Sequence, residues 1–248
     1  MLRPALLAFL IACLAPASGA AEVSVAVAAN FTAPMQKIAA AFEQASGHRA
    51  ALAFGSTGRF YAQVRNGAPF QVLLAADDET PQRLEQEGLA VPGTRFTYAI
   101  GRLVLWSATP AVVDAQGEVL RKPGEGRIAI ADPRLAPYGA AAVEVMRKLG
   151  VARALQPRLV QGESIGQAFQ FTSTGNAAMG FVALSQVMSD GRISRGSWWV
   201  VPAALHTPIR QDAVLLPPGR DNPAARALLE FLRGDAAQAI LRAHGYER

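Results

Sequence analysis

The sequence is poor in the residues that hold cations or carry out covalent catalysis. Among 248 residues it has one cysteine, Cys13, and three histidines, at positions 48, 206 and 244. Histidines spaced this widely do not form a metal-ligand pattern, so we expect no free cation site. The sequence also has no P-loop, no G-x-G-x-x-G fingerprint and no nucleophile–base signature. These absences argue against an enzyme and against a bound cofactor.

Charge of neither sign is gathered into a long run. The formal net charge is +5, but lysine and arginine are scattered and never occur three in a row. No aromatic–basic alternation suggests a nucleic-acid surface, so we expect no nucleic-acid partner. A weakly cationic surface of this kind would help to steer a small anion toward the protein at low ionic strength.

Residues 1–21 have the pattern of a secretory signal peptide. Arg3 supplies a positive charge, residues 5–15 form a short apolar run, and small residues lead to an expected cleavage near Ala20 or Ala21. The apolar run has about half of the roughly 20 residues that a membrane-spanning helix needs. We therefore expect an exported, periplasmic protein without a permanent membrane helix.

Cys13 allows a second interpretation of the same segment. The run Leu10–Cys13 resembles the lipobox of bacterial lipoproteins, in which the cysteine carries the lipid anchor. Cleavage near Ala20 or Ala21 would instead remove Cys13 and exclude disulfides and thiolate chemistry from the exported protein. We favour the signal peptide and keep the lipoprotein as the alternative.

Short apolar strands alternate with amphipathic helices along the rest of the chain. Such alternation predicts an α/β fold of βαβ units around mostly parallel sheets. We expect strands at residues 23–28, 50–54, 72–75, 102–107, 127–131, 158–160, 178–183 and 198–201. We expect helices at residues 32–44, 59–66, 80–87, 139–149, 165–173, 184–189, 224–234 and 236–243.

The order of these elements predicts two lobes, each a mostly parallel sheet flanked by helices. Lobe I would comprise residues 22–100 and 206–248, and lobe II residues 101–205. A long strand-like segment, Phe96–Trp106, would cross to lobe II, and His206–Leu216 would cross back. These two crossover strands form the expected hinge. Ligands of open α/β sheets lie beyond the carboxyl ends of the strands, so we expect the site in the cleft between the lobes.

Two strand-to-helix turns near the N-terminus carry polar residues without charge. A helix N-terminus presents unpaired N–H groups and a partial positive charge, which together favour an anion. Asn30 lies in the first turn, where we expect it to cap the following helix. Ser56 and Thr57 lie in the second turn, where their hydroxyl groups can cap or donate. The two turns predict half of an oxyanion site.

Two further turns, in the expected lobe II, supply candidates for the other half. Tyr138 brings a phenolic donor to the start of the helix expected at 139–149. Ser164 is a candidate cap for the next helix, which leaves the backbone N–H of Ile165 free. Glu163 should face solvent, because a carboxylate aimed at the site would repel an anion.

Four segments resemble the periplasmic molybdate-binding proteins of ABC transporters, a branch of the type II periplasmic solute-binding proteins. They are VAANFTAPM (27–35), FGSTGRFYAQVRNGAPFQVLLAADDETPQRLEQEGL (54–89), IAIADPRLAPYG (128–139) and AMGFVALSQV (178–187). The resemblance implies a type II fold whose lobes close on molybdate or tungstate, held by hydrogen bonds without a countercharge. It also implies delivery to an ABC permease with its ATPase, and a monomeric receptor.

The resemblance assigns ligand donors to positions in all four turns. The implied ligand residues are Asn30, Ser56, Thr57, Tyr138 and, through its backbone N–H, Ile165. Molybdenum would be held as its oxyanion, by Thr57 and Ile165 among others, and not as a free cation. Some relatives have a tyrosine at the position of Ala183 and an alanine at that of Tyr138. We therefore expect Tyr138 to supply the phenol from a different direction.

Two alternatives remain open at this point. Molybdate is a dianion that only accepts hydrogen bonds, and sulfate shares this pattern, so a receptor for sulfate or another tetrahedral oxyanion is the first alternative. The size of the pocket must separate the two anions, and the sequence does not give that size. An exported serine hydrolase using Ser56 or Ser164 is the more distant alternative. It would need a base, and the histidine nearest to Ser56 in the sequence is His48.

Overall fold

The structure is a computed structural model that describes residues 20–124 and 126–247. Most of the expected signal peptide, with Cys13, therefore lies outside the described residues. Within them, the eight strands and eight helices expected by residue range begin and end within two residues of the observed ones. The returning crossover strand, expected at His206–Leu216, is observed at Ile209–Leu215, and three short elements at Ala152–Leu155, Met188–Ser189 and Arg192–Ile193 were not expected. One expectation is wrong in detail, because the segment Phe96–Trp106 is not one strand. It is divided at Arg102 into two strands that belong to different sheets.

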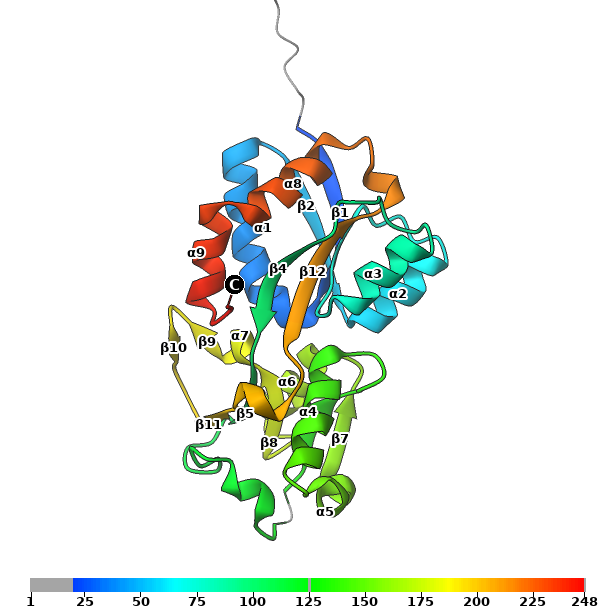
Figure 1. Ribbon diagram of the computed structural model, residues 1–248. Helices are drawn as coiled ribbons and strands as arrows, with labels where there is room; N and C mark the ends of the chain where they lie inside the picture. Colours follow the sequence, from blue (N-terminus) through cyan, green and yellow to red (C-terminus); the bar gives the residue numbers. More distant parts are fainter. Residues whose placement is uncertain (1–19, 125, 248) are drawn as a thin grey trace, which may run out of the picture.

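The first sheet is built from both ends of the chain (Figure 1). Its strand order is β2-β1-β3-β12-β4. The strands are β1 (Glu22–Ala28), β2 (Arg49–Gly55), β3 (Val72–Leu74), β4 (Phe96–Gly101) and β12 (Ile209–Leu215). β2, β1 and β3 are parallel, whereas β12 runs antiparallel to both β3 and β4. We call this sheet and its helices lobe I.

Helices cover both faces of the lobe I sheet, and Figure 1 shows them as two groups. One group is α1 (Thr32–Ser46), α8 (Pro223–Arg233) and α9 (Asp235–Ala243). The other group is α2 (Thr57–Arg65) and α3 (Glu79–Gln86). The two groups enclose separate apolar clusters, one around Phe31 and Leu228 and one around Phe60 and Leu84.

The second sheet is built from one continuous stretch of chain between β4 and β12. Its strand order is β11-β5-β8-β6-β7. The strands are β5 (Leu103–Ser107), β6 (Ile128–Ala131), β7 (Leu159–Gly162), β8 (Met179–Ala183) and β11 (Ser197–Val200). The helices are α4 (Pro137–Lys148), α5 (Ala152–Leu155), α6 (Ile165–Ser173) and α7 (Leu184–Val187). We call this half lobe II.

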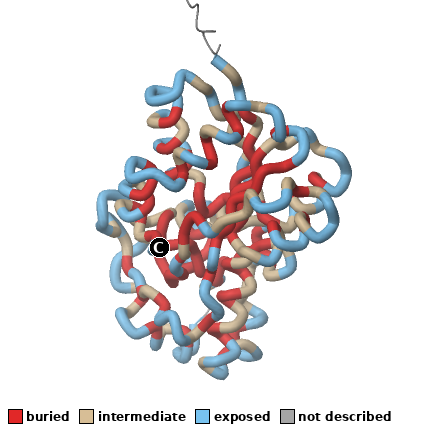
Figure 2. Tube along the Cα trace, turned by 45° about the horizontal axis from the view of Figure 1, so that its top comes forward, coloured by how far each residue is buried: buried red, intermediate tan, exposed pale blue. Residues whose placement is uncertain are grey.

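The remaining elements are short connections. They are the strand pair β9 (Met188–Ser189) and β10 (Arg192–Ile193), and the 3-10 turns η1 (Ala29–Phe31), η2 (Glu118–Arg121), η3 (Gln156–Arg158), η4 (Ala203–Leu205) and η5 (Pro217–Gly219). Figure 2 shows buried residues concentrated in the interior of the molecule. Every residue of β5, β6 and β8 is buried, as expected for strands covered on both faces. The two-lobed α/β fold is confirmed, with one strand in each sheet running against the others.

The two connections between the lobes lie side by side. β4 passes into β5 through Arg102, and the chain returns to lobe I at the start of β12. β4 and β12 pair as antiparallel neighbours from Ile209 opposite Gly101 onward, and the register shifts between Gln211 and Asp212. A pair of adjacent strands is the geometry that allows one lobe to rotate relative to the other.

Gly139, in the first turn of α4, allows this turn to pack closely against the end of β6. A Cβ atom at Gly139 would lie 2.3 Å from the backbone oxygen of Ala131, so no side chain fits there without moving the backbone. Tyr138 precedes Gly139 in the same turn of α4. The close packing of this turn against β6 therefore also fixes the position of Tyr138 between the lobes.

We predict that Gly139→Ala destabilises the protein, although alanine favours a helix more than glycine does. Forcing a methyl group into a packed contact costs about 1–3 kcal/mol, and urea denaturation of the ligand-free protein would measure this loss. Gly124→Ala is the control, because its Cβ would meet only the Arg158 side chain at 3.5 Å or more. Equal stability of Gly139→Ala and wild type would contradict the prediction.

Candidate functional site

The structure brings all five sequence-predicted ligand residues together around one small cavity between the lobes. Asn30, Ser56 and Thr57 come from lobe I, and Tyr138 and Ile165 come from lobe II. The cavity is small and enclosed between the lobes, with a volume of about 10 Å³. The lobes are therefore closed over the site in this structure.

The other residues around the cavity are small and apolar. They are Ala28, Ala29, Gly55, Ala76, Ala136 and Pro137. Among the described residues that line the cavity, none carries a charged side chain. Helices α2, α4 and α6 and the turn η1 all begin at or beside it, so their N-terminal N–H groups gather there. The arrangement favours an anion through dipoles alone.

Ser56 presents a buried hydroxyl group that the protein itself does not use. It is the N-cap residue of α2, but its side chain makes no capping hydrogen bond. The residue is only 4% exposed, and within the described part of the chain its Oγ has no hydrogen-bond partner. Leaving a buried polar group unpaired costs about 1–3 kcal/mol. A ligand that accepts a hydrogen bond from Ser56 would recover this cost.

The Thr57 hydroxyl group accepts a hydrogen bond within the protein, and its own hydrogen stays free to donate. The Oγ1 atom accepts a hydrogen bond from the backbone N–H of Ala76 at 2.9 Å. A hydroxyl group has one hydrogen to donate, and this contact does not use it. Thr57 is fully buried beside the cavity, and its hydroxyl hydrogen therefore remains available to a ligand.

The expectation that Asn30 caps α1 is wrong. Asn30 lies inside η1, and the N-cap residue of α1 is Phe31, which makes no side-chain cap. Its Nδ2 group instead donates to Gln211 Oε1 at 2.8 Å and to Tyr246 Oη at 2.9 Å. Both side-chain hydrogens are thus engaged within the protein, because the extra 3-10 turn carries the side chain inward. Asn30 can still offer its backbone N–H to a ligand.

Tyr138 lines the cavity as a buried phenol at the start of α4. Its Oη accepts a hydrogen bond from Gln211 Nε2 at 3.0 Å, which leaves its own hydrogen free to donate. Burial, with a smaller contribution from Tyr246, raises the pKa of Tyr138 well above its usual value. The phenol therefore stays protonated and remains a donor at neutral pH.

Ile165 is the first residue of α6, as the sequence predicted. Ser164 caps this helix by accepting a hydrogen bond from the Gln167 N–H at 3.3 Å. The N–H of a first helical residue has no partner inside its own helix, so Ile165 can donate from the backbone. Glu163 is exposed, as expected, and forms an ion pair of 2.9 Å with Arg59 of lobe I.

A polar network that sequence reasoning missed surrounds the site. Gln211, Ser185 and Tyr246 are buried and bonded to Asn30, although they lie between 155 and 216 residues further along the chain. Contacts at such separations leave no local pattern. Gln211 stands between the charged residues Arg210 and Asp212 in β12, so its polar side chain did not mark it out in the sequence.

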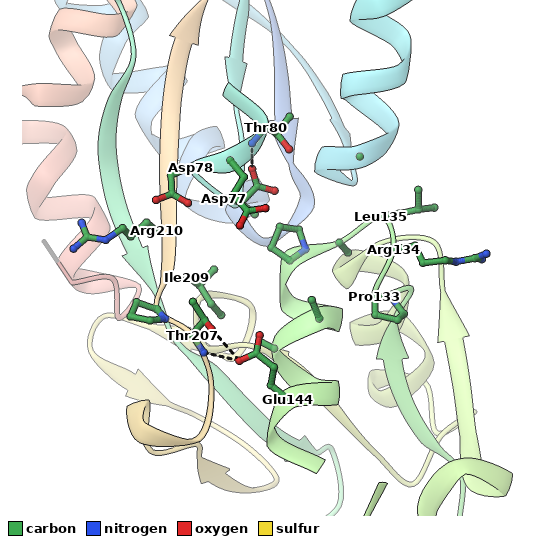
Figure 3. A pocket seen from close by; sticks show the side chains of 18 residues that line it. Asp77, Asp78, Thr80, Pro133, Arg134, Leu135, Glu144, Thr207, Ile209 and Arg210 are labelled. Atoms are coloured by element: carbon green, nitrogen blue, oxygen red, sulfur yellow. Dashed lines mark hydrogen bonds between the residues drawn. The ribbon is translucent and has the colours of Figure 1, made fainter. Parts of the chain in front are cut away.

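A larger pocket of about 310 Å³ opens beside the small cavity, and the two share Ala76, Ala136 and Pro137 (Figure 3). Its charged lining residues are Asp77, Asp78, Glu79, Arg134, Glu144 and Arg210. Asp77 accepts a hydrogen bond from the Thr80 N–H at 2.8 Å and so occupies one of the free N–H groups in the first turn of α3. Among the described residues, no group of three or more His, Cys, Asp or Glu side chains is placed to hold a metal ion.

Several contacts join the lobes around the site, among them the following three. The Gly58 N–H donates to the Leu135 oxygen at 2.9 Å. Ser185 Oγ donates to the Asn30 backbone oxygen at 2.7 Å, and the Arg59–Glu163 ion pair is the third contact. These contacts hold the cavity closed.

Two lobes joined by adjacent strands, with a neutral cavity between them, define the class of two-lobed solute receptors. The chain belongs to the bacterial extracellular solute-binding proteins, whose family model matches residues 23–247. No helix among the described residues is long and apolar enough to cross a membrane.

The chain is similar to proteins with a known ligand. It is 59% identical over 233 residues to the molybdate-binding protein ModA of Azotobacter vinelandii, covering 94% of this chain and 92% of that protein. It is 54% identical over 233 residues to ModA of Rhodobacter capsulatus, covering 94% and 91%. The solved structure of the periplasmic molybdate-binding protein of Azotobacter vinelandii matches with a TM-score of 0.89 at 42% identity, covering 91% of this chain and 99% of that chain. The sulfate-binding protein SubI of Mycobacterium tuberculosis shares the fold, with a TM-score of 0.75 at 13% identity.

We predict that the stability of the protein depends on the ionisation of Asp77. Burial raises the pKa of Asp77 to about 6, whereas an unfolded aspartate titrates near about 3.9. The folded protein therefore binds the proton more tightly, and stability from this group is lost as the pH rises from about 4 to about 6. Asp77→Asn should raise the free energy of unfolding by about 3 kcal/mol at pH 7.5 and by little at pH 4.

Urea denaturation at both pH values would measure this difference. Asparagine retains an oxygen that accepts from the Thr80 N–H, so the helix cap is preserved. Asp78→Asn is the matched control, because it removes a charge from the same turn and reports the effect of net charge alone. A gain of the same size at both pH values would contradict the assignment to Asp77.

Proposed function

We propose that this chain is an extracytoplasmic receptor that binds molybdate in the cavity between its lobes and delivers it to an ABC permease. The observation that carries the proposal is the cavity itself, which is closed, uncharged and lined by groups with hydrogens left to donate. The similarity to molybdate-binding proteins over more than nine-tenths of the chain supports the choice of anion.

The proposed donors are the hydroxyl groups of Ser56, Thr57 and Tyr138 and the backbone N–H groups of Asn30 and Ile165. A fully deprotonated oxyanion accepts from all of them, whereas a protonated oxyanion such as hydrogen phosphate would need an acceptor in the cavity. Each hydrogen bond to a charged group contributes roughly 1.5–3 kcal/mol. Five such bonds are sufficient for submicromolar affinity after the costs of ordering and closure.

The proposed biological setting follows from the class of protein. The receptor is exported to the periplasm after loss of residues 1–21, acts as a monomer, and presents closed lobes to a permease and its ATPase. Residues 22–100 with 206–248 and residues 101–205 are the proposed rigid units. Tungstate, which has the same charge and shape, is the proposed second ligand, and no cofactor takes part.

The structure gives the hydrolase alternative no catalytic base. His48 precedes β2 and Ser56 follows it, so about 25 Å of extended chain separates the two. Among the described residues, no histidine lines the cavity. The similar proteins are receptors and not enzymes, and the same holds for this chain.

Titration calorimetry of the ligand-free protein with molybdate, tungstate, sulfate and phosphate tests the proposal. We expect submicromolar binding of molybdate and tungstate and far weaker binding of sulfate and phosphate. Submicromolar sulfate binding without heat from molybdate would replace the proposed receptor by a sulfate receptor.

We predict that Ser56→Ala and Thr57→Ala each weaken molybdate binding at least tenfold. Each variant removes a buried donor and leaves one oxyanion oxygen without its partner, at a cost of about 1.5 kcal/mol or more. Ser173→Ala is the control, because its hydroxyl group is exposed at the far end of α6 and contacts only the Gln170 oxygen. Unchanged affinity in Thr57→Ala would show that this turn does not contact the ligand.

A further inference from the structure

We infer that Gln211 is a positioning residue for the anion site, acting through Tyr138. Its side-chain amide fixes the direction in which the Tyr138 hydroxyl group donates, so that the hydrogen faces the cavity. The inference rests on the proposed function, because it concerns the same oxyanion.

Gln211 is placed where the two lobes join. It lies in β12, is 0% exposed, and stands at the register shift between β12 and β4. The neighbouring strand makes room for it, since a Cβ at Gly101 would lie 2.0 Å from Tyr138 Oη and 2.4 Å from Gln211 Nε2. A glycine in β4 thus allows the amide and the phenol to meet.

The donors around Gln211 determine how its amide is oriented. Its Oε1 accepts from Asn30 Nδ2 at 2.8 Å, and it lies 3.0 Å from Tyr98 Oη, which can donate either to it or to the Ala75 backbone oxygen at 3.0 Å. An amide oxygen facing two donors leaves its NH₂ group facing the other way, toward Tyr138 Oη at 3.0 Å. A phenol oxygen that accepts this bond must turn its own hydrogen elsewhere, either to the cavity that Tyr138 lines or to the neighbouring Tyr246 and Asn30 side chains. An oxyanion in the cavity is the stronger acceptor of these, because it carries charge.

The orientation of Asn30 is fixed in turn by a ring of hydrogen bonds that spans both lobes. Asn30 Nδ2 donates to Tyr246 Oη at 2.9 Å, and Tyr246 donates to Ser185 Oγ at 3.0 Å. Ser185 Oγ donates to the Asn30 backbone oxygen at 2.7 Å, which closes the ring. Tyr246 Oη also lies 3.1 Å from the Asn30 backbone oxygen, so its one hydrogen can go there instead of to Ser185. In both cases Asn30 Nδ2 remains the donor to Tyr246 and to Gln211, and this orients the Gln211 amide toward Tyr138.

A double-mutant cycle measures whether Gln211 acts through Tyr138. Gln211→Met fills a similar volume but neither donates nor accepts a strong hydrogen bond, so the Tyr138 hydroxyl group is free to turn. We expect it to weaken molybdate binding about tenfold in the wild-type background and less than about twofold in the Tyr138→Phe background. Equal losses in both backgrounds, or no loss in either, would overturn the role of Gln211.

A second variant keeps the shape of the side chain and tests its polarity. In Gln211→Glu the carboxylate accepts from Tyr138 and draws its hydrogen away from the cavity, so affinity should fall at least tenfold at pH 8. A buried glutamate has a raised pKa, and once protonated it again offers a donor to Tyr138. Affinity should therefore recover toward the wild-type value as the pH falls to about 5.5. A deficit that does not change with pH would overturn the inference.

The side chains that face Gln211 do not titrate over this range. Burial raises the pKa of both Tyr98 and Tyr138 well above the usual value, and it also raises the pKa of Tyr246 behind Asn30. The nearest charged pair is Asp212 with Arg95, and Asp77, whose pKa is raised to about 6, acts on Tyr98 and does titrate over this range. All three groups are present in every variant, so wild-type affinity measured at the same pH values serves as the reference.

Tyr98→Phe is the matched control for the network. It removes one donor to Gln211 Oε1 but leaves the Asn30 contact that orients the amide, so affinity should change less than about threefold. Thermal denaturation of each ligand-free variant reports folding. A wild-type protein that bound none of the four anions would contradict the proposed function, whereas wild-type binding with additive losses would overturn the role of Gln211 alone.

Discussion

A water-excluding cavity without a countercharge can hold an anion only through hydrogens that are aimed at it before the ligand arrives. The rest of the structure depends on this constraint. Neutral donors are individually weak, so several must converge, and they come from four helical N-termini in two lobes. The hydrogen of each donor must also be kept from bonding to an acceptor within the protein. Ser56 meets this condition by having no partner, whereas Thr57 and Tyr138 meet it by accepting from Ala76 and Gln211. The same constraint explains why the charged residues Asp77 and Arg134 lie in the outer pocket and not in the cavity.

Closure and binding are one event in such a site. Neither lobe alone surrounds the cavity, because the Ser56 side belongs to lobe I and the Tyr138 side to lobe II. The Gly58–Leu135 and Ser185–Asn30 contacts form only when the lobes meet. A ligand that bridges the two sets of donors therefore favours the closed arrangement, and the permease encounters a shape that reports occupancy.

The sequence alone was sufficient to predict most helices and strands and the polar turns between them, because each of these depends on residues that are close together in the chain. Alternating apolar runs and helix caps predicted the strands and helices to within two residues, and the Ser56-Thr57 turn was recognisable from its neighbours alone. The break at Arg102 could not be predicted, since β4 and β5 read as one apolar run and only their partners in different sheets divide them. The role of Asn30 was misjudged for a similar reason. Its side chain is directed by Gln211 and Tyr246, which are distant in sequence and meet it only when the N-terminal and C-terminal segments of lobe I come together.

The position of β12 has a consequence for how the protein forms. It lies in the interior of the first sheet, between β3 and β4, yet it is made after every strand of the second sheet. A chain that emerges N-terminus first can complete the second sheet from one continuous stretch, while the first sheet still lacks a strand that pairs two of its members. Contacts between residues so far apart form slowly. Lobe I is thus the last to mature, and the chain spends that interval with the edge of β3 uncovered and open to helper proteins or to misassociation.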